Sequence, residues 1–164
     1  MNGTSANRFE PKALATRGMI WTMLARLSKA PVNNGKYWYS AGQEWAKSRN
    51  ISDGTNPNQN ITRQDIITML WRYYGSKKDS SLEALKRFYD ENQVSDYAKQ
   101  AMAWAIESGI VVGSNGKLNP LGYANRAEIA AILTRAANLQ QFIDFDSTVI
   151  ILHEATVTSE MVVR

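Results

Sequence analysis

The chain has 164 residues, of which 44% are hydrophobic and 21% charged, a composition typical of one soluble folded domain. Its net charge of +4 favours acidic partners, but no run of like charges exceeds two residues, which excludes a basic stripe for nucleic acid. The absence of cysteine excludes disulfides, thiolate metal sites and cysteine nucleophiles, and no apolar run reaches the ~18 residues of a membrane span.

The first six residues are polar and lack the pattern of a signal peptide. We therefore expect any export signal of the parent protein to lie upstream of them. Residues 1–15 are predicted to be mostly loop, with Phe9 as an anchoring side chain. The lack of cysteine is compatible with the cytosol and with the exterior of a bacterium.

One sequence pattern occurs three times, over residues 11–24, 57–70 and 120–133. In each copy a proline stands six residues before an arginine and a leucine seven residues after it; the arginines are Arg17, Arg63 and Arg126. The positions three, six and seven after each arginine are apolar, which is the spacing of one helix face. The sequence therefore predicts a repeat protein with a helix beginning at each arginine, the first over about 17–29.

The residue before each arginine is of a type that caps helices, namely Thr16, Thr62 or Asn125. In two copies a carboxylate follows three residues later, as in a capping box: Asp65 after Thr62 and Glu128 after Asn125. The first copy has Met19 at this place and lacks the reciprocal half of the box.

The arginines themselves need a further explanation. A cation in the first turn opposes the helix dipole, at a cost of ~0.3–1 kcal/mol when exposed. Each arginine therefore requires a partner, and the sequence leaves two kinds open. One is structural, such as a carbonyl or carboxylate of the neighbouring repeat. The other is an anionic ligand shared with the free amide groups of the helix N-terminus.

Two more helices are predicted, over 36–47 and 96–105, because a small residue lies between aromatic residues in both. They match position by position, Trp38, Gly42, Trp45 and Ala46 against Tyr97, Ala101, Trp104 and Ala105. A small residue lets helices approach closely, so Trp45 and Trp104 are predicted in the core. Trp38 and Tyr97 stand at the helix starts, where both core packing and stacking on a ligand are open.

The remaining segments carry weaker signals. Asp53-Gly54 and Asn115-Gly116 predict turns, in loops with too few acidic residues for calcium. Residues 76–89 are predicted to be an insertion packed on the outside, with a short helix capped by Ser80 and Glu83. Residues 139–164 are rich in β-branched residues and predict a β-like tail that forms a hairpin, covers the domain or contacts another chain.

The unit of aromatic helix, Gly-rich loop with Asn-Pro and arginine helix resembles the S-layer homology module of bacterial surface proteins. The motifs that carry the resemblance are Ile-Thr-Arg-Gln-Asp at 61–65, Asn-Arg-Ala-Glu at 125–128 and Trp-Ala-Ile-Glu-Ser-Gly-Ile-Val-Val-Gly at 104–113. It covers residues 9–138, or about two and a half repeats. The expected division is a repeat domain over 1–138 and the tail over 139–164. The domain comprises a partial repeat 9–30, a repeat 36–75, the insertion 76–89 and a repeat 90–138.

The resemblance implies an all-α domain with pseudo-threefold symmetry, located outside the cell at the bacterial cell wall. Such modules bind secondary cell-wall polysaccharides, often ones with acidic pyruvyl ketals, and need no cofactor or metal. By this resemblance the anion-binding residues are Arg17, Arg63 and Arg126, with Trp38 and Tyr97 beside the grooves. The chain departs from the pattern at its first repeat, which lacks an aromatic helix.

An enzyme is the least supported class. The one histidine, His153, lies in the tail, and acidic pairs such as Asp90-Glu91 lack a supporting constellation. The alternative to a wall anchor is a structural or assembly module on the same scaffold. That module would use the tail, residues 139–164, for protein contact or self-association.

Overall fold

The computed structural model describes residues 10–76 and 79–138. Its α-helices are α1 (Arg17–Leu27), α2 (Ser40–Ser48), α3 (Arg63–Tyr73) and α4 (Lys99–Glu107), and residues 126–138 are also helical. Three short 3₁₀ helices join them, η1 (Leu82–Arg87), η2 (Glu91–Gln93) and η3 (Asp96–Ala98). Within these ranges the strand pairing is limited to isolated bridges. The fold is all-α, as predicted, while the predicted β-like tail lies outside the described residues.

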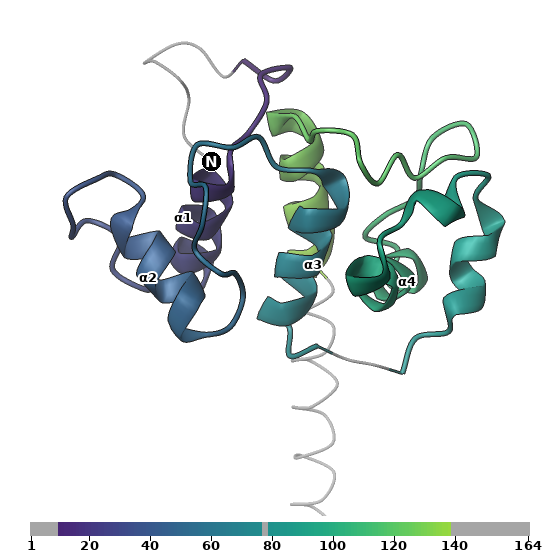
Figure 1. Cartoon of the computed structure of the whole chain (residues 1–164), viewed down its shortest axis with the longest axis horizontal. Coiled ribbons are helices and arrows are strands. Elements are labelled where there is room, and N and C mark those ends of the chain that lie inside the picture. Colours follow the sequence, from purple (N-terminus) through teal and green to yellow (C-terminus); the bar gives the residue numbers. More distant parts are fainter. Residues whose placement is uncertain (1–9, 77–78, 139–164) are drawn as a thin grey trace, which may run out of the picture.

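The three helices that begin with an arginine are α1, α3 and the helix 126–138. Figure 1 shows them running side by side through the middle of the molecule, with α2 on one flank and α4 on the other. Their inward faces carry the apolar positions of the repeat, and Ile20, Ile66 and Ile129 are each at most 1% exposed. The threefold repetition in the sequence is therefore a threefold repetition in space.

The segments that precede these helices are joined by a closed ring of backbone hydrogen bonds. The amide of Ala15 donates to the carbonyl of Ala124, that of Ala124 to Ile61, and that of Ile61 to Ala15, over 3.2, 2.9 and 2.9 Å. Each residue stands two places before its arginine, and all three are at most 1% exposed. Because buried amides and carbonyls must be paired, this ring holds the three copies together at their centre.

The same arrangement explains the spacing between proline and arginine. The second amide of each arginine helix donates to the proline carbonyl of the next copy: Gly18 to Pro57, Gln64 to Pro120 and Ala127 to Pro11. The first amide donates to the carbonyl two residues after that proline, as from Arg63 to Gly122 over 2.9 Å. The six-residue spacing thus brings the carbonyls of one copy onto the helix start of another.

The flanking helix α2 differs from the prediction at its start. It begins at Ser40 and not near Lys36, because the hydroxyl of Ser40 accepts the amide of Tyr37 over 3.0 Å and holds the preceding residues in a turn. Trp38 therefore lies in that turn, 54% exposed, and not on the helix face that carries Trp45. Trp45 and its counterpart Trp104 are in the core, as predicted, at 7% and 5% exposure.

The predicted short helix in the insertion is also shifted. It is the 3₁₀ helix η1, capped by the hydroxyl of Ser81, which accepts the amide of Glu83 over 3.2 Å. Ser80, the predicted cap, lies one residue too early because a 3₁₀ turn is tighter than an α turn. Ala84 and Leu85 are buried, and η1 packs beside α4.

Candidate functional site

Three clefts lie between neighbouring copies of the repeat. Each is lined by the arginine that begins one helix and by the residues two, five, six and nine places after the arginine of another. Cleft A has Arg17 with Asp65, Thr68, Met69 and Arg72. Cleft B has Arg63 with Glu128, Ala131, Ile132 and Arg135. Cleft C has Arg126 with Met19, Thr22, Met23 and Arg26. Their volumes are about 300, 730 and 200 Å³.

The aromatic residues complete two of these clefts. Tyr97 lines cleft A and Trp38 lines cleft C, and both are 54% exposed. Cleft B has no aromatic side chain among the described residues that line it. The described residues include no aromatic helix before α1 that could contribute such a side chain to cleft B, and this cleft has the largest volume of the three.

In cleft A the arginine is held by the loop that precedes α3. The Nη2 atom of Arg17 lies 2.6 Å from Oδ1 of Asp53, and its Nε donates to the carbonyl of Thr55 over 3.0 Å. The amide of Thr55 is the main cause that lowers the pKa of Asp53, with Arg17 adding to it and burial opposing it. Because Asp53 is 61% exposed, this ion pair remains open to water on one side.

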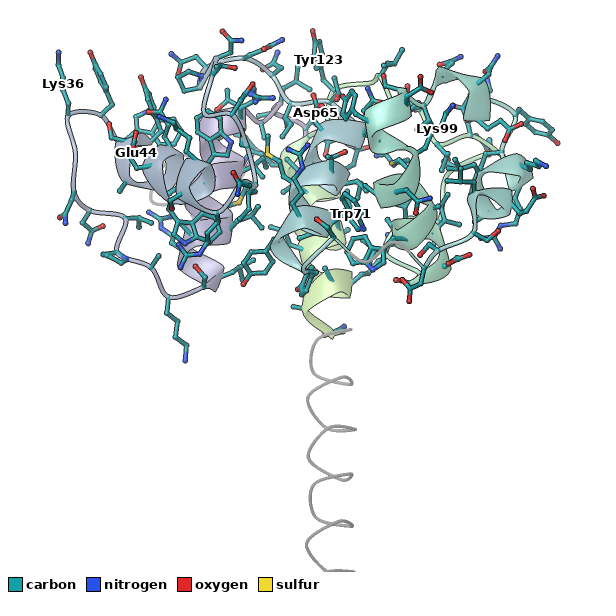
Figure 2. The ribbon with its side chains drawn as sticks, turned by 60° about the horizontal axis from the view of Figure 1, so that its bottom comes forward. Lys36, Glu44, Asp65, Trp71, Lys99 and Tyr123 are labelled. Atoms are coloured by element: carbon teal, nitrogen blue, oxygen red, sulfur yellow. The ribbon has the colours of Figure 1, made fainter. Side chains whose placement is uncertain are left out.

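Tyr97 joins the same cleft through its hydroxyl. That group donates to Oδ1 of Asp65 over 2.6 Å and accepts from Nε2 of Gln64 over 3.0 Å. Burial, and then the bond to Asp65, raise the pKa of Tyr97 to about 12. Asp65 was predicted to complete a capping box with Thr62; the Thr62 hydroxyl does accept the amide of Asp65, but the carboxylate binds Tyr97. Figure 2 shows Asp65 in the first turn of α3, with Trp71 further along that helix.

We expect the pKa of Tyr97 to fall from about 12 towards its ordinary value near 10 in Asp65→Asn. The substitution removes the negative charge that disfavours the phenolate and leaves the site otherwise the same size. Because the folded-state pKa is raised, the stability due to this group is present below pH 10 and is lost between pH 10 and 12. Titration of the Tyr97 ring followed by carbon NMR measures the shift, and an unchanged pKa would show that Asp65 is not its cause.

In cleft B the arginine belongs to a network that crosses between repeats. The Nη1 atom of Arg63 donates to Oε1 of Glu128 over 2.8 Å, and its Nε donates to the carbonyl of Leu118 over 2.9 Å. Glu128 also forms the predicted reciprocal pair with Asn125, with amides donating to side-chain oxygens in both directions over 2.9 Å. One carboxylate therefore caps a helix and binds the arginine of the previous copy.

Cleft C has a different chemistry. Arg126 is 6% exposed at its floor, and no carboxylate is among the described residues that line it. The position of Asp65 and Glu128 is occupied here by Met19. Thr16 does not cap α1 as predicted: its buried hydroxyl makes no hydrogen bond in the described part of the chain, and the amide of Met19 donates to the carbonyl of Thr16 instead.

The helix N-termini do not offer free amides to a ligand. The first two amides of each arginine helix donate to carbonyls of a neighbouring copy, and the third donates to its own cap residue. The expectation that an anion shares these amides with the arginine was therefore wrong. Of the two kinds of arginine partner that the sequence left open, the structural kind is present, because Arg17 and Arg63 bind internal carboxylates; both arginines also line a cleft.

A second set of arginines lines the clefts and was not predicted from the sequence. Arg26, Arg72 and Arg135 each stand nine residues after the first arginine of their copy, and each lines a cleft. Arg72 donates to the carbonyl of Ile51 over 3.1 Å, and Arg135 to that of Ile110 over 3.2 Å. The signal was present in the sequence, since the nine-residue spacing recurs in all three copies.

Other kinds of site find no support in the described residues. No three acidic, histidine or cysteine side chains there are grouped so that they could hold a metal ion. None of the helices in residues 10–76 and 79–138 is long and apolar enough to cross a membrane.

Comparison with known proteins agrees with this geometry. Residues 87–130 match the family model described as S-layer homology domain. The chain is 32% identical over 150 residues to a protein named exoglucanase XynX from Acetivibrio thermocellus, covering 81% of this chain and 14% of that protein. It is also 32% identical over 150 residues to an amylopullulanase from Thermoanaerobacterium thermosulfurigenes, covering 81% and 8%. Over 52 residues it is 42% identical to a surface-layer 125 kDa protein from Lysinibacillus sphaericus, covering 31% and 4%.

The fold and the clefts define a helical repeat module with charged inter-repeat grooves. Residues 87–130 are, within it, an S-layer homology domain, which is a non-catalytic module of cell-surface proteins that attach to the cell wall. The chain spans less than a fifth of the length of these three relatives.

Proposed function

We propose that this domain anchors a protein to the bacterial cell wall by binding an anionic secondary cell-wall polysaccharide in its three inter-repeat clefts. The observation that carries the proposal is the repetition of the clefts. In all three, the first arginine of one copy and the arginine nine residues after the first arginine of another copy line the same cleft, although the other lining residues differ. The proposed location is the outer surface of the bacterium.

The internal ion pairs support a carboxylate ligand. A guanidinium binds carboxylates in a planar, directed way, and Arg17 and Arg63 already do so with Asp53 and Glu128. Those two carboxylates are 61% and 37% exposed, so the contribution of each pair to stability is small and a ligand carboxylate can compete for the arginine. The half-exposed rings of Trp38 and Tyr97 offer apolar faces of the kind on which a sugar ring packs.

Three clefts on one rigid body also suit a repeating polymer. In clefts A and B each contact is weak because Arg17 and Arg63 are shared with internal carboxylates. Once one cleft is occupied, however, the next sugar of the same chain is held nearby at a high effective concentration. Firm attachment then needs no single tight site.

The proposal is tested by sedimenting the domain with purified cell-wall polysaccharide from Lysinibacillus sphaericus, before and after mild acid removes its acidic substituents. We expect loss of binding after the treatment, which leaves the protein itself unchanged. We also expect at least ~10-fold weaker binding for Arg63→Ala combined with Arg126→Ala, since each charged hydrogen bond contributes ~1.5–3 kcal/mol.

Lys86→Ala combined with Arg87→Ala, on η1 away from the three clefts, is the control for net charge because it also removes two positive charges, and circular dichroism checks that each variant is folded. Equal binding to treated and untreated polysaccharide would contradict the proposal. Deletion of residues 139–164 tests the assembly alternative, which expects loss of self-association and no change with the arginine variants.

A further inference from the structure

Among residues 10–76 and 79–138, Arg26 is the one arginine of its set whose side chain has no structural partner. Its counterparts Arg72 and Arg135 bind the carbonyl of the loop that follows the aromatic helix of the same repeat. Residues 10–16, which precede α1, contain no such helix or loop. Arg26 is exposed, and its side chain makes no hydrogen bond or ion pair within residues 10–76 and 79–138, so its guanidinium is available in cleft C.

The residue two places after the first arginine distinguishes cleft C from the other two. In clefts A and B it is a carboxylate, and both Asp65 and Glu128 accept hydrogen bonds from groups that line the same cleft. In cleft C it is Met19, which is half-buried. The described lining of cleft C therefore contains two arginines together with the apolar surfaces of two methionines and Trp38, and it contains no acidic residue.

We propose that Arg26 and Trp38 make cleft C the strongest anionic-sugar site of the domain, with Met19 as the residue that sets this preference. Arg26 binds the acid group, and the half-exposed indole of Trp38 packs against the sugar ring. The volume of about 200 Å³ is below the ~300–1,000 Å³ of pockets for drug-sized ligands, so cleft C holds a single sugar residue. This assignment rests on the proposed function, because it chooses among the clefts that would bind the polysaccharide.

The sharpest test exchanges Met19 for Glu and for Gln. A Glu at this position faces Arg126 as Glu128 faces Arg63, and it can complete a capping box with Thr16, whose hydroxyl lacks a partner in the described residues. We therefore expect Met19→Glu to be at least as stable as the wild type and yet to bind a hexose with a pyruvyl ketal ~10-fold more weakly. Met19→Gln, which has the same length and also suits the box, should bind within about threefold of the wild type.

Arg26→Gln provides the second variant, with Arg87→Gln as its control because both remove one positive charge from an exposed position. We expect ~10-fold weaker binding for Arg26→Gln and no change for Arg87→Gln, measured by calorimetry with the same sugar. The methyl ester of the sugar acid should bind the wild type and Arg26→Gln equally, because it carries no charge for Arg26 to recognise.

The outcomes separate this assignment from the proposed function. If the wild type binds the polysaccharide but not the single sugar, or if Met19→Glu and Arg26→Gln bind the sugar as well as the wild type does, the assignment to cleft C is overturned and the anchor remains. If the wild type binds neither the sugar nor the polysaccharide, the proposed function itself is overturned.

Discussion

Asp90→Ala is expected to lower the free energy of unfolding by about 3–5 kcal/mol, because Asp90 is a charged acceptor for two backbone amides at once. Its carboxylate oxygens accept the amides of Leu118 and Asn119, each over 2.8 Å, and its side chain is almost fully buried. Removal of the carboxylate leaves both amides without their acceptor beneath the loop that leads to the helix 126–138. Urea denaturation at pH 7 measures the loss.

The effect extends beyond one loop because Leu118 is shared. Its amide binds Asp90 while its carbonyl accepts from Arg63, which in turn binds Glu128. This series of contacts joins the end of the insertion to two arginine helices around cleft B. Loss of Asp90 is therefore expected to loosen Arg63 as well as the loop.

The pH dependence gives an independent check. Burial tends to raise the pKa of Asp90, but the two amides, helped by Lys117, outweigh it and lower the pKa below its ordinary value of 3.8. A lowered folded-state pKa means that the stability due to Asp90 is present above about pH 4 and is lost as the pH falls through the lowered pKa. The difference in stability between wild type and Asp90→Asn should therefore shrink between pH 5 and pH 2. Glu91→Gln, the adjacent carboxylate, should change stability by less than ~0.5 kcal/mol.

The repeat and its helices were predictable because their signals are local. The spacing of apolar residues after Arg17, Arg63 and Arg126 depends only on helix geometry, and all three helices begin at these arginines. The late start of α2 was not predicted, because it depends on one hydroxyl, that of Ser40, which closes a turn around aromatic residues. Because of this single hydrogen bond, Trp38 lines a cleft and does not lie on the predicted helix face.

The partners of the arginines were not predictable, because they come from distant parts of the chain. Arg17 meets Asp53, and Arg63 meets Glu128, 36 and 65 residues away. The ring of backbone bonds among Ala15, Ile61 and Ala124 is equally distant in sequence, and it consumes amides that would otherwise be free. Local sequence patterns identified several residues that line the clefts, but they could not predict which internal group each arginine binds.

The structure gives Met19 a second role. In the sequence, Met19 only occupies the position at which a carboxylate would complete a capping box. In space the same position faces the arginine of another copy, so the absence of a carboxylate alters the charge of a cleft as well as the start of a helix. One substitution in a repeat can thus weaken a cap and change a binding surface at the same time.

Gly42→Ala is expected to destabilise the domain although alanine is the better helix former by ~1 kcal/mol. A Cβ atom at Gly42 would lie 2.8 Å from the backbone nitrogen and 2.9 Å from the Cα of Thr22 in α1. Backbone atoms inside a helix cannot move aside, so α2 must shift away from α1. Overpacking of this kind costs ~1–3 kcal/mol, and Gly42→Val, which adds two more carbon atoms to a stiff side chain, should cost more.

The sign of the effect is what makes this prediction informative. If α2 did not pack closely on α1, Gly42→Ala would raise the free energy of unfolding, as substitution of an exposed helical glycine does. Glu44→Ala, at an exposed position of the same helix, is the control and should remain within ~0.5 kcal/mol of the wild type in urea denaturation. Because Trp38 lies two residues before the start of α2, a shift of that helix also moves the indole away from Gly18 and cleft C, so Gly42→Ala should weaken sugar binding together with stability.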